Sequence, residues 1–204
     1  MPFELRPEPT PTLRPEESYL QTTWQQSVYP IAEQMGVKIQ LPTVSPQPYT
    51  HLAFEGYQFA KEQGKGNAYT HRMFTAFFQE SQDIGDVEVL TKLATEVGLE
   101  ADAFREALVS RKYKTAHEAA LKHAFEEKKI TAVPTMVIGE HTIRGMLRAE
   151  DLVRVLKTLE EAYSTFKGYL QENTTETEKH FLTLSYPYKR RHLLDCFRKL
   201  GFSA

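Results

Sequence analysis

A short β-hairpin most constrains what this chain can fold into. Thr135–Ile138 is apolar and suits a strand, Gly139-Glu140 supplies a tight turn, and His141–Arg144 predicts the returning strand. Two strands alone are only marginally stable in water, so the hairpin needs more sheet. The other segments that suit strands are Phe3–Leu5 and Phe181–Ser185. The sequence therefore predicts a sheet that is short of a strand.

Pro134 stands directly before the first strand of this hairpin, in the stretch ITAVPTMVIG (residues 130–139). Proline cannot donate a hydrogen bond to a neighbouring strand, so it is confined to edge strands, strand starts and bulges. Taken from these residues alone, the pattern favours a trans proline that opens an edge strand.

Helical periodicity dominates the chain before the hairpin. A helix is expected from Pro15 to a glycine C-cap at Gly36, interrupted or kinked at Pro30, followed by a proline-rich linker over 37–48. Asp86 is expected to cap a later helix. Five further helices are predicted, at residues 48–63, 67–79, 87–97, 100–109 and 111–128, and another follows the hairpin at 149–170.

These patterns divide the chain into four parts. Residues 1–14 form a residual strand with a proline-rich segment, 15–129 a helical block, 130–170 the proline loop, hairpin and helix, and 171–204 a divergent tail. In the tail, HFLTLSYPY suits a strand and KRRHLLDCFRKLGF suits a basic amphipathic helix.

Composition excludes several classes of protein. The 204 residues are 41% hydrophobic and 25% charged with a net charge of −2, so neither a nucleic-acid-binding protein nor a membrane-spanning one is indicated. One cysteine permits no internal disulfide, and the N-terminus has no apolar stretch typical of a signal peptide. We therefore expect a cytoplasmic protein.

Several stretches resemble the DsbA-like branch of the thioredoxin superfamily, in particular its FrnE-type cytoplasmic members. They are PFEL at 2–5, RMFTAFFQESQDIGD at 72–86, VLTKLATEVGLEADAFREAL at 89–108, ITAVPTMVIG at 130–139 and IRG at 143–145. The resemblance covers about residues 2–160 and implies an α/β (α+β) fold, in which a thioredoxin-like sheet carries a large all-helical insertion.

The same resemblance implies an incomplete amino-terminal part. Domains of this family open with a strand, a Cys-x-x-Cys loop and a helix, whereas this chain begins at the PFEL segment. Two explanations stay open. Either Met1 is an internal methionine of a longer protein, or the chain is a diverged relative in which Phe181–Ser185 fills the gap in the sheet.

For function, the resemblance implies a thiol–disulfide oxidoreductase whose partner is a substrate protein or a small thiol. It implies that Pro134 is cis and that Val133, Pro134 and Thr135 bind substrate. Disulfide exchange needs an attacking and a resolving thiol, and the lone Cys196 cannot be both. We therefore expect no catalytic residue and no dithiol activity in the 204-residue chain.

Two rival functions stay open beside this one. The first is a relative of glutathione-dependent isomerases or kappa-type glutathione transferases, in which the opening loop carries Ser or a lone Cys. The second is a non-enzymatic binding module, and a homo-oligomer is compatible with either. We expect no cofactor and no metal.

Single residues outside the proline loop have ordinary interpretations. His192 and Cys196 have ligand-compatible spacing, but no second pair accompanies them, so a zinc site is not favoured. Phe74, Phe77 and Phe78 are interpreted as a core stripe rather than a pocket lining. The histidines at 51, 71, 117 and 123 are interpreted as surface or hydrogen-bonded core residues.

Overall fold

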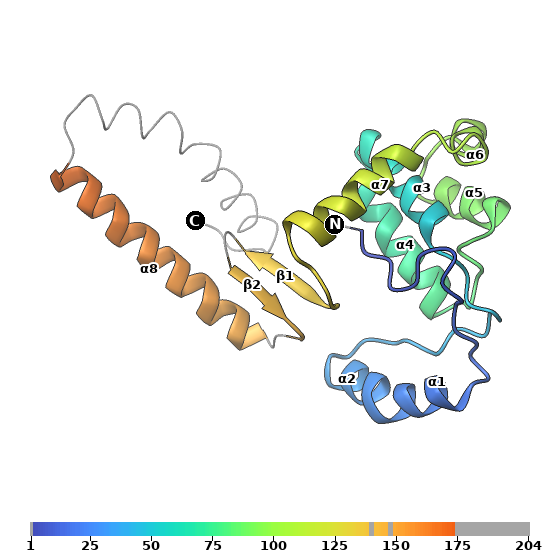
Figure 1. Cartoon of the computed structure of the whole chain (residues 1–204), viewed down its shortest axis with the longest axis horizontal. Helices are drawn as coiled ribbons and strands as arrows, with labels where there is room; N and C mark the ends of the chain where they lie inside the picture. Colours follow the sequence, from blue (N-terminus) through green and yellow to red (C-terminus); the bar gives the residue numbers. More distant parts are fainter. Residues whose placement is uncertain (1, 139–140, 147–148, 174–204) are drawn as a thin grey trace. The chain divides into compact units, whose positions relative to one another are not determined.

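The computed structural model describes residues 2–138, 141–146 and 149–173 (Figure 1). Its contacts divide the chain into two compact units, Met1–Ile130 and Thr131–Ala204, which are described separately below. None of the described helices is both long and apolar enough to cross a bilayer.

The first unit is built around five helices and a final π-helical turn. Their bounds are α3 His51–Glu62, α4 Gly66–Phe78, α5 Val87–Glu96, α6 Ala101–Val109, α7 Lys114–Lys122 and the turn η2 His123–Glu127. All five helices were predicted, but two begin three residues late: the helices expected from residues 48 and 111 begin at His51 and Lys114. Arg111 has a φ of +53°, which interrupts the α-helical backbone there.

Helix α3 lies at the centre of this unit and contacts α4, α5, α6 and α7. Its Gly56 allows the close approach, because a Cβ at that position would lie 2.7 Å from the ring of Phe104. The surrounding core consists of Ala53, Phe59, Ala60, Tyr69, Met73, Ala76, Phe77, Ile84, Leu90, Leu93, Ala94, Leu99, Phe104, Ala107, Leu108 and Tyr113. Phe77 belongs to it as predicted, but Phe74 does not, since its side chain is 61% exposed.

Two carboxylates cap helices of the first unit. Asp86 accepts hydrogen bonds from the backbone N–H groups of Glu88 and Val89, which confirms the predicted cap of α5. Glu100 does the same for α6, accepting from Asp102 and Ala103. These bonds satisfy amides that a helix start leaves without intrahelical partners.

The segment before α3 is helical but irregular. It consists of α1 Ser18–Thr23, the π-helical turn η1 Trp24–Val28 and α2 Tyr29–Gln34. The helix was expected from Pro15 and begins three residues later. Pro30 has no N–H and would clash with the carbonyl four residues before it, so an ordinary α-turn is excluded there. The predicted interruption therefore takes the form of a π turn, and Gly36 follows the helix with a φ of +66°.

The second unit contains the hairpin and a long helix. Strands β1 Thr135–Ile138 and β2 His141–Arg144 pair antiparallel, with Thr135 opposite Arg144 and Ile138 opposite His141, as predicted. Helix α8 runs from Ala149 to Asn173. Leu152, Val155, Leu156 and Leu159 form its half-buried stripe.

The predicted strand at Phe3–Leu5 is wrong. Within the described residues the sheet consists of β1 and β2 alone, so this segment has no strand to pair with. Phe3 packs on a helical turn instead: its ring lies 4.9 Å from the ring of Phe125 in η2. Phe181–Ser185 lies outside the described residues.

Replacing Phe104 with alanine tests the central packing of the first unit. Phe104 is fully buried, edge-on to Phe59 at 5.4 Å and tilted against Tyr69 at 5.8 Å. We expect Phe104→Ala to lower the free energy of unfolding by about 3 to 5 kcal/mol, because it leaves a cavity. Phe74→Ala, at an exposed position, is the matched control and should cost less than about 1 kcal/mol in urea unfolding. Equal losses in the two variants would contradict this packing.

Candidate functional site

The proline loop is the candidate site in the second unit. The Val133–Pro134 peptide bond is cis, and Pro134 leads directly into β1. Two hydrogen bonds hold the loop: Thr135 Oγ1 donates to the Ala132 carbonyl at 2.6 Å, and the Gly145 N–H donates to the Pro134 carbonyl at 2.9 Å. The second bond ties the loop to the end of β2, so the hairpin fixes its shape.

Val133 presents its backbone at this loop. Its side chain is 48% exposed, and within the described part of the chain neither its N–H nor its carbonyl has a hydrogen-bond partner. Unpaired amide and carbonyl groups next to a strand can add an extended peptide by backbone hydrogen bonds. Of the three residues predicted from the sequence, Val133 and Pro134 are exposed and Thr135 is half-buried at the start of β1.

A buried carboxylate–imidazole pair lies in the first unit. Glu4 and His117 are both almost fully buried, and the Glu4 carboxylate is hydrogen-bonded to His117 Nε2. Phe54 stacks on the imidazole at 5.3 Å, while Nδ1 of His117 has no partner among the described residues. The pair anchors the start of the chain to α7. The histidine pattern did not reveal it, because Glu4 is remote in sequence and sits in an apolar segment.

A second buried carboxylate belongs to Glu55. Arg111 binds it through Nε and Nη2, at 3.0 and 2.7 Å. The side chain of Glu55 is fully buried, whereas that of Arg111 is 39% exposed. The hydrogen bond to Glu55 raises the pKa of Arg111 above its usual value. The pair holds α3 against the chain before α7.

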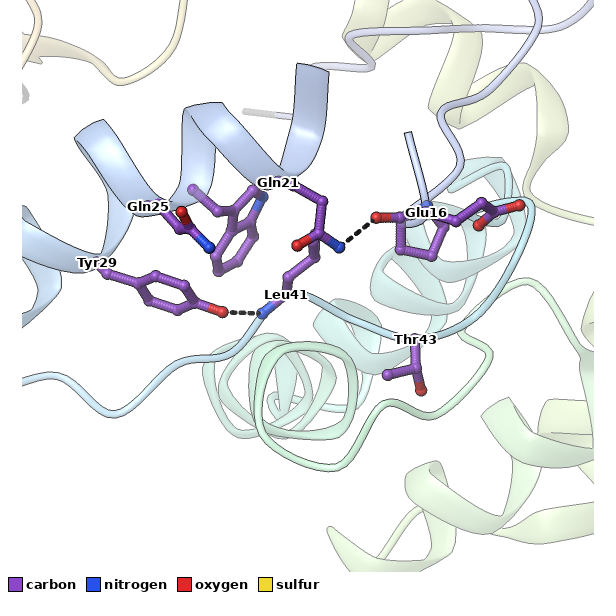
Figure 2. Close-up of a pocket in the computed structure, with 8 residues that line it drawn as sticks. Glu16, Gln21, Gln25, Tyr29, Leu41 and Thr43 are labelled. Atoms are coloured by element: carbon purple, nitrogen blue, oxygen red, sulfur yellow. Dashed lines mark hydrogen bonds between the residues drawn. The ribbon is translucent and has the colours of Figure 1, made fainter. Parts of the chain in front are cut away.

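A pocket of about 440 Å³ lies between the irregular helix and the linker that follows it (Figure 2). Figure 2 shows Gln21, Gln25 and Tyr29 on the helix side, with Leu41 and Thr43 across from them. The indole of Trp24 lies beside Tyr29, 5.4 Å between ring centroids. The Leu41 N–H donates to the Tyr29 hydroxyl at 3.1 Å, which ties the two walls together. The lining is completed by Pro15 and Glu16.

The other sequence-based candidates do not form a site. Phe77 lies in the core and Phe74 on the surface, so the phenylalanines do not line one cavity. No three potential ligands among His, Cys, Asp and Glu come together in the described residues. His192 and Cys196 lie outside those residues. The pocket over Trp24 was missed; Pro30 inside a helical pattern was the one signal for it.

Comparison with known proteins gives consistent results. The family model of the DSBA-like thioredoxin domain matches residues 1–157. The uncharacterized protein YwbO of Bacillus subtilis (strain 168) is 56% identical over 146 residues, which is 71% of this chain and 73% of YwbO. A solved structure of 2-hydroxychromene-2-carboxylate isomerase (HCCA isomerase) matches 77% of this chain and 72% of its own, with a TM-score of 0.54 at 19% identity. The predicted thioredoxin-like fold with a helical insertion is confirmed.

A double-mutant cycle tests the Glu4–His117 pair. His117→Leu leaves a buried carboxylate without its partner, so we expect it to lower the free energy of unfolding by about 3 to 5 kcal/mol. The double variant Glu4→Leu with His117→Leu should cost less than the sum of the two single changes, with a coupling of about 1 to 3 kcal/mol in urea unfolding. Additive single changes would contradict a direct interaction.

Proposed function

Because this chain belongs to the DSBA-like thioredoxin domain family, we propose that its proline loop receives the thiol or disulfide substrate. The unpartnered backbone of Val133 beside β1 is the observation that carries the proposal. An extended substrate segment would pair with this backbone, and Thr135 would keep the loop in its receptive shape through the bond to Ala132.

We propose further that the 204-residue chain does not itself catalyse dithiol exchange. A thiolate attacks the disulfide and a second thiol resolves the mixed disulfide, so the cycle needs two cysteines within reach of each other. This chain has one, Cys196. The loop would then supply substrate binding without the reactive pair. A FrnE-type, cytoplasmic protein fits this proposal, since reduced thiols persist in that compartment.

A glutathione-dependent reaction is the second candidate. An isomerase or kappa-type transferase of this fold needs no cysteine pair, because glutathione itself brings the thiol. The opening loop would separate the two candidates: Ser or a lone Cys there means a glutathione enzyme, and Cys-x-x-Cys means a dithiol oxidoreductase. A binding module without catalysis remains the alternative if neither activity is found.

A binding experiment with an unfolded polypeptide tests the proline loop. An unfolded polypeptide with S-methylated cysteines would be titrated into the isotope-labelled chain, with backbone amide shifts as the readout. We expect shifts at Ala132, Val133 and Thr135, and about fivefold weaker binding by Thr135→Ala, which removes one hydrogen bond of the loop. Thr142→Ala, an exposed threonine on β2, is the matched control and should bind normally. Shifts confined to other residues would refute the loop as the binding surface.

Turnover assays separate the candidate reactions. We expect the chain not to accelerate insulin reduction by dithiothreitol, because a resolving thiol is missing. Robust insulin reduction that survives Cys196→Ser would overturn this expectation. Conjugation of glutathione to an electrophilic aromatic substrate, measured by absorbance, would favour the second candidate.

A further inference from the structure

We propose that the pocket over Trp24 binds an extended peptide segment that carries apolar and neutral or basic side chains. The pocket is formed entirely by the first unit, from residues 15–43, and its chemistry involves no thiol. This goes beyond the proposed role of the proline loop, which lies in the other unit. It would give the protein a second way of holding a polypeptide.

A π turn lies in the helical wall of the pocket. Trp24 and Gln25 belong to η1, and Tyr29 follows it directly. A π turn carries one extra residue, which changes the face that the following residues present, and such turns are frequent at functional sites. Gln21, Gln25 and Tyr29 follow one another at intervals of four residues and line the same cavity. The linker residues Leu41 and Thr43 form the opposite wall.

The floor and one wall are apolar. Trp24 is 8% exposed and packs edge-on to Tyr29, while Phe78 lies 6.0 Å from the indole on another side. Pro15 and Leu41 add aliphatic surface. Aromatic and proline surfaces of this kind accept apolar side chains or proline rings of extended peptides. A volume of about 440 Å³ lies in the usual range for ligand pockets.

The polar groups match a peptide backbone. Gln21 donates through Nε2 to the Pro15 carbonyl at 2.8 Å, which leaves its Oε1 as an acceptor. Within the described residues, the Gln25 amide and the Thr43 hydroxyl make no hydrogen bond, so each can donate and accept. A peptide group needs one donor and one acceptor from its receptor. Side-chain amides beside an aromatic floor supply both.

The charge of the pocket selects against anions. No Lys, Arg or His is among the lining residues, and Glu16 lines one end, where both of its carboxylate oxygens accept from the Ser45 hydroxyl. A backbone hydrogen bond and the Ser45 hydroxyl hold the pKa of Glu16 below its usual value, so the group is ionised at neutral pH. Arg14 approaches Glu16 at 3.8 Å, but this exposed pair is weak and Arg14 does not line the pocket. A small anionic thiol such as glutathione lacks a cationic partner here.

Tryptophan fluorescence can test this directly, because Trp24 is the one tryptophan of the chain. The probe is a capped peptide, acetyl-Gly-Pro-Leu-Pro-Lys-Gly-amide, which has no aromatic residue and no cysteine. We expect a saturable change in emission on titration into the full chain. The same peptide with glutamate in place of lysine should bind several-fold more weakly. The Glu16→Gln variant should show a smaller difference in affinity between the two peptides.

Gln25→Ala and Gln26→Ala form a matched pair of variants. Both residues are exposed and lie in the same π turn, but Gln26 does not line the pocket. We expect Gln25→Ala to weaken binding about fivefold, through loss of one hydrogen bond, and Gln26→Ala to leave it unchanged. Thr43→Ala serves as a second lining variant if circular dichroism shows that Gln25→Ala is misfolded.

Three results would overturn the proposal. They are the absence of a saturable change at millimolar peptide, equal affinities for the Gln25→Ala and Gln26→Ala variants, and a tighter response to glutathione than to the basic peptide. Thr135→Ala should leave the fluorescence titration unchanged, so failure at this pocket and failure at the proline loop are separate outcomes.

Discussion

The close packing of α3 at Gly56 is the constraint on which the first unit depends. A side chain there would collide with Phe104 of α6 and with Tyr69 of α4, so three helices could not meet at this point. Tyr69 uses the space to donate its hydroxyl to the Ala53 carbonyl at 3.1 Å, and burial raises its pKa well above the usual range. The neutral phenol is therefore part of the core. Around this meeting point, α3 also carries the buried Glu55 that binds Arg111.

Short-range sequence patterns predicted much of this arrangement. The contacts between residues far apart in the sequence were not predicted. Asp86, the hairpin and the helices of the first unit are encoded within a few residues each, by capping chemistry, turn residues and apolar periodicity. The partners of Glu4 and Glu55 are more than fifty residues away. Nothing in the neighbouring sequence identifies such partners. The same holds for Phe3–Leu5, whose residues suit a strand but require a neighbour to become one.

The proline loop and the pocket over Trp24 also differ in how far the sequence indicated them. Val133, Pro134 and Thr135 were found through resemblance to a family, because proline before a strand is uninformative by itself. The structure adds what the motif could not give, namely the exposure of Val133 and the bonds of Thr135 and Gly145. The pocket over Trp24 escaped prediction because it depends on how the linker folds back on the helix, where Leu41 is hydrogen-bonded to Tyr29. In the part of the chain that the structure describes, both surfaces carry amide groups without a hydrogen-bond partner.

The pocket depends on the number of residues in the π turn as well as on the identity of the side chains that line it. Removing one residue from Trp24–Val28 would rotate the preceding part of the helix against the following part by about 100°. Tyr29 would then lose its bond to Leu41, and the two walls would separate. A single-codon deletion could therefore abolish this pocket while every residue that lines it was retained.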